Sequence, residues 1–561
     1  MSDRHFAFWP EHAPRHLHVP ETNLYYNVEV SAARFPKKPF LIFYDTPITF
    51  LQFKQETEAM AAYLQQVCGV KKGDRVLLYM QNSPQFMIGY YAILRANAVV
   101  VPVNPMNLTG ELKHYVSDAD ARVALVSQEL YPRMKPLLNP GGDESGLDHL
   151  VVAAYSDYLR APTTLNVPDF VAAPRAPISG AGVSLWADAM ARSLTPGPLT
   201  VGPDDLCVMP YTSGTTGHPK GCMHTHRTTM YNTVSGGVWG QGNQGTVSMA
   251  VLPLFHVTGM QGAMNGVLYG GSTVVLLPRW DRDAAAECVQ RYRITGLGLI
   301  TAMVVDFVSN PKLDQYDLSS LRRIGGGGAA MPQAVADILE KKLGLKYGEG
   351  YGMSETNAAT HMNPPDRSKK QCLGVPIFDV DARVVDPNTL QELPPGETGE
   401  IIVSGPQVMV GYWKNPDATR DAFVEIDGKR FLRTGDLGQT DAEGYFFFVD
   451  RLKRMINAAG FKVWPAEVEA LLYQHPAVQE ACIIAAKDAK RGETVKAFVV
   501  LKKDAVGKVT EQEIIDWSHA NMAAYKIPRI VEFVEALPKS GTGKVMWREL
   551  QEKENARSTA A

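Results

Sequence analysis

The sequence contains few cysteines, six in 561 residues, and none of them forms a Cys-x-x-Cys pair. This scarcity argues against a zinc site or a disulfide framework and favours a reducing compartment, so we expect a cytoplasmic protein. No uncharged apolar run reaches the roughly 18 residues of a membrane-spanning helix. The first residues also lack the apolar core of a signal peptide. The sequence leaves a peripheral membrane contact open.

Excess charge of one sign is also missing. The 56 Lys and Arg residues nearly balance the 59 Asp and Glu residues, which gives a net charge of −3. No basic cluster stands out, so nucleic acid is not an expected partner. The hydrophobic content of 45% is ordinary for a globular protein. A chain of 561 residues exceeds what one core usually serves, and we expect at least two domains.

Strand-like and helix-like segments alternate through about the first 450 residues. Strands are predicted at residues 76–80, 99–103, 122–127, 272–277 and 296–300, and helices at 82–96, 111–117 and 283–292. This alternation predicts an α/β fold, in which a large N-terminal domain has parallel-rich sheets covered by helices. Residues 136–200 are rich in Pro, Gly and Ala and are interpreted as a long surface excursion.

The chain changes character near residue 450. The charged segment Asp450–Arg454 is followed by a compact pattern: helix 465–475, strands 478–486 and 494–501, helix 511–522 and strand 529–534. This pattern predicts a small, mobile α+β domain. We therefore expect domains at 1–452 and 453–561, with a hinge at Lys453.

A phosphate-binding loop is predicted between Tyr211 and Gly221. It holds three glycines, four Ser or Thr hydroxyls and Lys220. Glycines let backbone N–H groups approach a polyphosphate, hydroxyls donate hydrogen bonds and the lysine adds a positive charge. The loop is not a Walker A motif, because Pro219 stands where that motif has glycine.

Five further segments carry groups suited to a nucleotide. They are the glycine run of Arg323–Pro332, the segment Gly350–Thr356, the tripeptide Thr434–Asp436, the pair Asp450–Lys453 and Gly460–Val463, and the loop Pro538–Lys544. Four consecutive glycines suggest a backbone against which a flat ligand lies. Alone, each segment is weak evidence.

Together and in this order, the segments resemble those of the adenylate-forming (acyl-activating) superfamily, from about residue 35 to residue 550. Within it, the sequence resembles bacterial medium- and long-chain fatty-acyl-CoA synthetases, which are AMP-forming acid–thiol ligases. The resemblance implies ATP, Mg²⁺ and coenzyme A as cofactors and a carboxylic acid as substrate. It also implies an acyl-adenylate intermediate and a role in fatty acid and lipid metabolism.

The resemblance assigns a role to individual residues. The phosphates would be held by Thr212, Ser213, Gly214, Thr215, Thr216, Gly217 and Lys220. Adenine would lie among Gly328, Ala329, Ala330, Glu349 and Tyr351, with Gly352 and Met353 in the same segment. Glu355 would ligate Mg²⁺, and Asp436 and Arg451 would bind the ribose. The catalytic residues would be Lys544, Thr356 and His256, and Gly460 and Lys462 would face the site after rotation of the small domain.

The expected acid is an apolar one. The candidate wall segments are Met230–Gly240, Thr301–Val308, Gly325–Ala329 and Thr356–Met362, and they contain small or apolar residues without Lys or Arg. A medium- or long-chain fatty acid is favoured, and an aryl acid of the coumarate or benzoate kind is the alternative. Trp239 either caps the acyl tunnel or packs in the core.

Other classes of protein are weighed against this prediction. An amino-acid adenylator would need a carboxylate for the substrate ammonium, and only Asp306 is available in the wall segments. A catalytically silent nucleotide-binding relative would be expected to lack Lys220, Glu355, Asp436 or Lys544, and all four are present. A luciferase-type oxygenase stays open as a function. A homodimer stays open as the oligomeric state.

Overall fold

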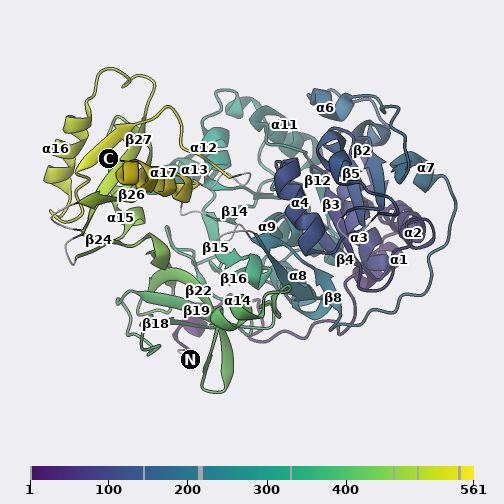
Figure 1. The fold of residues 1–561 in the computed structure, drawn as a ribbon, viewed down its shortest axis with the longest axis horizontal. Helices are drawn as coiled ribbons and strands as arrows, with labels where there is room; N and C mark the ends of the chain where they lie inside the picture. Colours follow the sequence, from purple (N-terminus) through teal and green to yellow (C-terminus); the bar gives the residue numbers. More distant parts are fainter. Residues whose placement is uncertain are drawn as a thin grey trace. The chain divides into compact units, whose positions relative to one another are not determined.

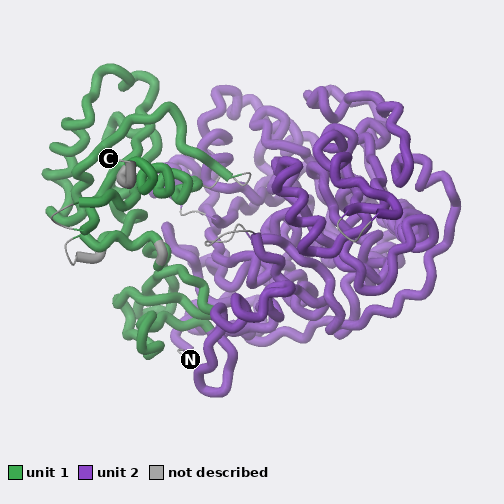
Figure 2. The backbone as a smooth tube through the Cα atoms, in the orientation of Figure 1, with its two compact units in different colours: residues 1, 382–403, 433–561 green, residues 2–381, 404–432 purple. Residues whose placement is uncertain are grey.

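The structure, a computed structural model, describes residues 3–142, 146–212, 219–328, 331–458, 461–488, 492–540 and 545–560. The chain divides into two compact units (Figure 2). Unit 2 comprises residues 2–381 and 404–432, and unit 1 comprises residues 382–403 and 433–561. The predicted division and hinge at Lys453 stay a prediction, and the Lys453 side chain lies outside the described part of the structure.

The first large sheet of unit 2 has a parallel centre and antiparallel edges. Its strands, in spatial order, are β17 (Val375–Pro376), β16 (Ala358–Met362), β15 (Tyr347–Met353), β14 (Arg323–Gly327), β13 (Gly296–Gly298), β11 (Val247–Ala250), β12 (Thr273–Leu276), β1 (Pro39–Phe43) and β2 (Thr46–Thr49). The pairs from β15 to β1 are parallel, and β16, β17 and β2 add antiparallel edges.

The second large sheet of unit 2 is built in the same way. Its strands are β20 (Gly411–Tyr412), β10 (Lys220–Thr225), β8 (Leu206–Val208), β4 (Val99–Pro102), β3 (Arg75–Tyr79), β5 (Val123–Ser127), β6 (His149–Ala153) and β7 (Val183–Leu185). The short strand β9 (Tyr211–Thr212) pairs with β10. Strands β8 to β7 are parallel, whereas β10 and β20 are antiparallel. The predicted α/β class is confirmed.

Helices cover the sheets of unit 2 (Figure 1). The longer ones are α1 (Tyr26–Arg34), α2 (Phe50–Gln66), α3 (Pro84–Arg95), α4 (Thr109–Asp118), α8 (His226–Trp239), α11 (Arg282–Tyr292), α12 (Thr301–Val308) and α13 (Gln333–Leu343). Shorter ones include α6 (Asp169–Ala172), α7 (Trp186–Met190), α9 (Val257–Gly259), α10 (Gly266–Tyr269) and α14 (Pro416–Asp421). Helix α3 starts where the sequence predicts, because Ser83 Oγ accepts a hydrogen bond from the Phe86 amide at 3.1 Å.

Both faces of the second sheet are buried, as a parallel sheet requires. Successive side chains of β3 point to opposite faces, so Leu78 joins the core that contains α3, whereas Leu77 joins a core that contains Leu112 of α4. Within the described ranges, none of the helices is long and apolar enough to cross a membrane.

The interpretation of residues 136–200 as a surface excursion is wrong. This segment contributes strands β6 and β7 to the second sheet, and Leu150 and Val151 are fully buried there. Trp186 of α7 is also buried. The strands are only five and three residues long and lie among Pro, Gly and Ala. Strand β6 pairs in parallel with β5 and β7, and parallel partners are joined by long connections, so the local pattern does not reveal either strand.

Unit 1 contains the predicted α+β pattern. A sheet of β25 (Phe461–Val463), β24 (Ile456–Ala458), β27 (Gly492–Leu501) and β26 (Val478–Asp488) is extended by β28 (Ile530–Phe533). Its helices are α15 (Pro465–Leu472), α16 (Glu511–Asn521) and α17 (Trp547–Ala560). Unit 1 also holds most of β18 (Asp381–Val385) and β19 (Gly399–Ser404), β23 (Phe446–Arg451) and the second part of β22 (Lys429–Thr440). In unit 2, the first part of β22 pairs with β21 (Phe423–Ile426).

Candidate active site

The stem of the predicted phosphate loop is a short antiparallel hairpin. Strands β9 and β10 pair so that Thr212 lies opposite Lys220. The Tyr211 hydroxyl donates to Asp118 Oδ2 at 2.6 Å, which ties the first strand to the end of α4. Residues 213–217, predicted to hold phosphates, lie outside the described residues, so their roles stay predictions. The structure thus brings Thr212 and Lys220 together at the base of the loop.

A tight turn between β15 and β16 carries Glu355 and Thr356. The Thr356 hydroxyl is buried, accepts a hydrogen bond from the Met353 amide at 2.9 Å and donates to the Ala358 carbonyl at 2.7 Å. The hydroxyl therefore holds its own turn together, and its contact with an α-phosphate stays a prediction. Asn232 of α8 supports the turn from outside by donating to the Asn357 carbonyl at 2.7 Å.

The turn is conformationally strained. Asn357 and Ala358 have φ angles of 51° and 93°, in a region that residues with a β-carbon rarely adopt. Gly352 sits opposite, and a β-carbon there would lie 1.7 Å from the Ala358 carbonyl oxygen. Only glycine fits this position, so packing explains why residue 352 of the predicted segment Gly350–Thr356 is a glycine.

A buried histidine supports the same turn from β10. His224 Nε2 lies 2.7 Å from the Ser354 carbonyl oxygen. Burial lowers the pKa of His224 to about 4, so the ring is neutral near pH 7. Because a carbonyl only accepts, Nε2 carries the proton and donates. Sequence reasoning missed this supporting role of His224.

Lys220 and Glu355 meet on one aromatic side chain, Tyr412 of β20. The Tyr412 hydroxyl donates to Glu355 Oε1 at 2.8 Å. The Lys220 ammonium nitrogen lies 4.2 Å from the centre of the Tyr412 ring, a cation–π contact. Burial raises the pKa of Tyr412 above its ordinary value, so the hydroxyl keeps its proton. The structure therefore joins two predicted nucleotide residues through a third that the sequence analysis did not select.

Of the predicted adenine residues, Gly328 directly follows β14, and Glu349, Tyr351, Gly352 and Met353 lie on β15. Gly328 has a φ of 90° and open space where a β-carbon would be, whereas a β-carbon on Gly326 would lie 2.2 Å from the Leu299 carbonyl oxygen. Close packing with a neighbouring strand thus explains part of the glycine run. The Tyr351 ring packs edge-on against His361 with centroids 5.5 Å apart. Ala329 and Ala330 lie outside the described residues.

Glu349 is a buried carboxylic acid on β15, with 6% of its surface exposed. Its Oε1 accepts a hydrogen bond from the Gln371 amide at 3.0 Å. Burial nevertheless raises the pKa of Glu349 to about 7, because it disfavours the charged form more than the backbone donors stabilise it.

His256 caps the N-terminus of helix α9. Its Nδ1 accepts a hydrogen bond from the Thr258 amide at 3.3 Å, and the side chain is half-buried. A stretch of π-helix follows at Met260–Asn265, an arrangement found frequently at functional sites. The predicted position of His256 beside the acid substrate stays a prediction.

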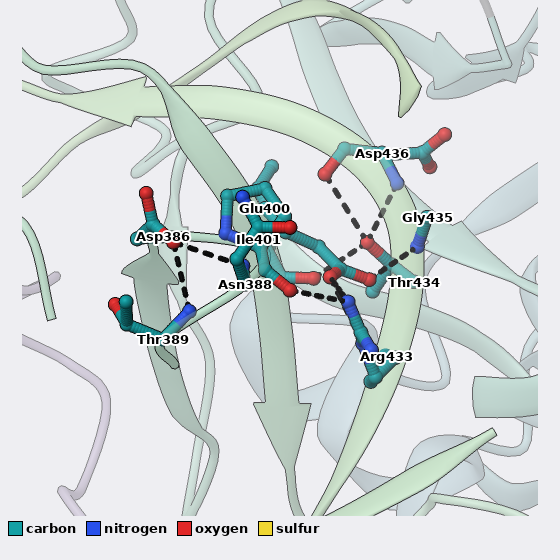
Figure 3. A network of polar contacts seen from close by, with 10 residues as sticks. Asp386, Asn388, Thr389, Glu400, Ile401, Arg433, Thr434, Gly435 and Asp436 are labelled. Carbon is teal, nitrogen blue, oxygen red and sulfur yellow. Dashed lines mark hydrogen bonds and ion pairs between the residues drawn. The ribbon is translucent and has the colours of Figure 1, made fainter. Parts of the chain in front are cut away.

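In unit 1, the predicted ribose residues form an ion pair. Asp436 and Arg451 lie opposite each other on β22 and β23, and Arg451 Nε is 2.9 Å from Asp436 Oδ1. Figure 3 shows the polar network around residues 433–436, the segment that ends at Asp436. The Thr434 hydroxyl donates to the Ile401 carbonyl at 2.6 Å and accepts from the Asp436 amide at 3.1 Å. Nearby, Arg433 Nε donates to the buried Glu400 at 2.9 Å. Asp436 is thereby held in one position.

The ends of the loop that carries Lys544 are joined. Lys539 and Val545 form an antiparallel bridge, and the Met546 amide donates to the Pro538 carbonyl at 2.8 Å. Lys544 and Gly460 lie outside the described residues, as does the side chain of Lys462. Their roles stay predictions.

Two side chains of the candidate wall segments, Trp239 and Asp306, have partners within unit 2. Trp239 is fully buried, donates through Nε1 to the Asn363 carbonyl at 3.1 Å and packs edge-on against Trp9 at 4.9 Å, which favours core packing over a tunnel cap. Asp306 lies 3.1 Å from Arg282 and accepts from Trp280 Nε1 at 2.7 Å. Its charge is thus already balanced within unit 2, which supports the argument against an amino-acid substrate.

Comparison with known proteins identifies the family to which this chain belongs. The family model described as AMP-binding enzyme matches residues 28–413, and the model described as AMP-binding enzyme C-terminal domain matches residues 467–544. The chain is 36% identical to the long-chain-fatty-acid–CoA ligase of Bacillus subtilis (strain 168), covering 98% of this chain and 97% of that one. It is 31% identical to 4-coumarate–CoA ligase 2 of Oryza sativa subsp. japonica, covering 93% and 90%. The crystal structure of the anthranilate CoA ligase AuaEII in complex with anthranoyl-AMP is similar, with a TM-score of 0.82, 26% identity and coverage of 97% and 99%.

The fold and these relatives define a nucleotide-dependent acid–CoA ligase. The chain belongs to the AMP-binding enzyme family. The resemblance to the adenylate-forming superfamily is confirmed, and so is the predicted class of enzyme.

Proposed function

We propose that this protein activates an apolar carboxylic acid with ATP and transfers it to coenzyme A, with a medium- or long-chain fatty acid as the favoured substrate. The observation that carries the proposal is the meeting of Lys220 and Glu355 on Tyr412 within unit 2. A cation and a carboxylate from distant segments, beside the stem of a Gly/Ser/Thr-rich loop, suit a metal-bound triphosphate.

The residues present fit Mg²⁺ that arrives with the nucleotide. Glu355 supplies one carboxylate, and across the described ranges no three His, Cys, Asp or Glu side chains gather as a metal-ligand set. Mg²⁺ in nucleotide sites is commonly held by one or two carboxylates together with phosphate oxygens. When bound, the ion would neutralise charge that develops on the phosphates.

The proposed chemistry has two steps. The substrate carboxylate attacks the α-phosphorus of ATP and pyrophosphate leaves; the thiol of coenzyme A then attacks the carbonyl of the acyl-adenylate and AMP leaves. Both reactants of the first step are anions, so Lys220 would offset phosphate charge, and Lys544 would stabilise the attacking carboxylate and the α-phosphate. His256 would lie beside the carboxylate. Rotation of the small domain about Lys453 would separate the two steps.

The choice of acid rests on the relatives and on the candidate wall. The fatty-acid ligase of B. subtilis is 36% identical and the coumarate ligase of rice 31% identical, so the aryl acid remains the second candidate. Asp306 is paired with Arg282, which leaves no argument for a cationic substrate there. As part of this proposal the protein acts in fatty acid metabolism in the cytoplasm, which its six buried thiols support.

The test is pyrophosphate release from ATP over a panel of acids from acetate to oleate, with benzoate and coumarate, each with and without coenzyme A. Release that depends on a fatty acid and on coenzyme A supports the proposal and brackets the chain length. Maximal release with aryl acids favours the second candidate. No release with any acid contradicts both.

A further inference from the structure

The backbone of Tyr412 is fixed to the strand that begins with Lys220. Strand β20 pairs with β10, with Tyr412 opposite Cys222, and the Trp413 amide donates to the Gly221 carbonyl at 2.8 Å. On its other edge, the Tyr412 amide donates to Thr419 Oγ1 at 2.9 Å. The tyrosine therefore cannot move without moving the base of the phosphate loop.

The same short segment also fixes Glu355. The Met409 amide donates to the Glu355 carbonyl oxygen at 2.8 Å, while the Tyr412 hydroxyl donates to the Glu355 carboxylate at 2.8 Å. Tyr412 is 8% exposed, so this hydrogen bond is largely shielded from water. Main chain and side chain of Glu355 are thus held by residues three positions apart on one segment.

We propose that Tyr412 is a positioning residue for metal-bound nucleotide, in that its hydroxyl orients the Glu355 carboxylate and its ring holds the Lys220 ammonium. The inference rests on the proposed function, since it takes Glu355 as the metal ligand. Partners that hydrogen-bond a ligating carboxylate set its orientation, and their loss typically weakens metal affinity by about 10- to 100-fold. The cation–π contact adds a separate effect on the lysine, and hence on phosphate binding.

Two substitutions separate the two contacts. Tyr412→Phe removes the hydroxyl and keeps the ring, whereas Tyr412→Leu removes both. The probe is Mn²⁺ with α,β-methylene-ATP: electron paramagnetic resonance measures the binding of Mn²⁺, and calorimetry without metal measures the binding of the nucleotide. Neither readout depends on turnover.

Unit 2 offers a closely matched control. The Tyr158 hydroxyl donates to Glu56 Oε2 at 2.6 Å, and the Arg160 guanidinium lies 4.3 Å from the Tyr158 ring centre. Tyr158→Phe therefore removes the same kind of hydrogen bond from a ring that also faces a cation, and neither Glu56 nor Arg160 is a predicted site residue. It reports what loss of a buried phenol hydroxyl does to the fold alone.

We expect Tyr412→Phe to weaken Mn²⁺ binding about 10-fold and to change metal-free nucleotide binding less than about 2-fold. Tyr412→Leu should weaken both, and Tyr158→Phe neither. Adding Tyr412→Phe to Glu355→Gln should cause no further loss of Mn²⁺ affinity, because the hydroxyl acts through that carboxylate. Wild-type Mn²⁺ affinity in Tyr412→Phe, or an undiminished loss in the Glu355→Gln background, overturns the inference. If the wild type binds the Mn²⁺–nucleotide pair but ligates no acid to coenzyme A, the proposed function fails while the role of Tyr412 stands.

Discussion

The buried carboxyl of Glu349 predicts how the stability of unit 2 depends on pH. Burial raises its pKa from 4.5 to about 7 in the folded protein. Between these values the folded chain holds a proton that the unfolded chain has released, so stability falls as pH rises. The loss is complete above the folded pKa and amounts to about 3 kcal/mol.

Glu349→Gln removes this dependence, because an amide has the shape of the neutral acid and does not ionise. The stability of the variant relative to the wild type should therefore increase with pH, by about 2 kcal/mol between pH 5.5 and pH 8. Urea unfolding of both proteins at several pH values measures this difference. Taking the difference cancels the titration of all other groups.

An exposed glutamate of unit 2 provides the control. Glu425 lies on β21 with its side chain in solvent, so Glu425→Gln makes the same substitution where no carboxyl is buried. A stability difference between Glu349→Gln and the wild type that does not increase with pH, or increases no more than the difference for Glu425→Gln, would refute the reasoning. That result would mean that Glu349 ionises in the folded state at an ordinary pH.

Two further predictions concern Lys544 and the turn at Glu355. Lys544→Ala should reduce adenylation at least about 100-fold, the order seen when a transition-state charge contact is removed, and should affect thioester formation from supplied acyl-adenylate much less; equal loss in both half-reactions, measured separately, would contradict its assigned role. Gly352→Ala should destabilise unit 2 by about 3 kcal/mol, because its β-carbon would lie 1.7 Å from the Ala358 carbonyl oxygen, whereas Gly348→Ala places its β-carbon 3.9 Å from the Ile324 carbonyl oxygen and should cost far less. Urea unfolding of the two variants compares them, and similar midpoints would show that the turn relaxes.

Local patterns in the sequence predict much of the fold. The strand predicted at 99–103 is β4 (Val99–Pro102), and the helix predicted at 283–292 is α11 (Arg282–Tyr292). Such segments carry their own signals: caps, apolar runs and periodicity. Strands β6 and β7 are not predicted, because they are short and because parallel pairing across long connections leaves no local signal in the sequence.

The candidate site shows the same division between local and distant information. Glu355 and Lys220 stand out in the sequence because each lies in a segment of unusual composition. The sequence assigns no role to Tyr412, because its contact with Lys220 forms only when β20 pairs with β10. The role of His224 is not predicted either, because nothing in the segment Lys220–Thr225 indicates the Ser354 carbonyl to which the ring donates.

The residues of the candidate nucleotide site fall into two groups that belong to different compact units. Lys220, Tyr412 and Glu355 interact within unit 2, whereas Asp436 and Arg451 pair within unit 1, to which Lys544 also belongs. If the first group alone holds the metal and the outer phosphates, Lys544→Ala should leave Mn²⁺ binding in the presence of α,β-methylene-ATP unchanged while it reduces adenylation at least about 100-fold. A fall in Mn²⁺ affinity of Lys544→Ala as large as that expected for Tyr412→Phe would contradict this separation, since the metal would then depend on both units. Unchanged Mn²⁺ affinity would mean that binding of the metal–nucleotide pair and catalysis of its reaction are carried by separate parts of the chain.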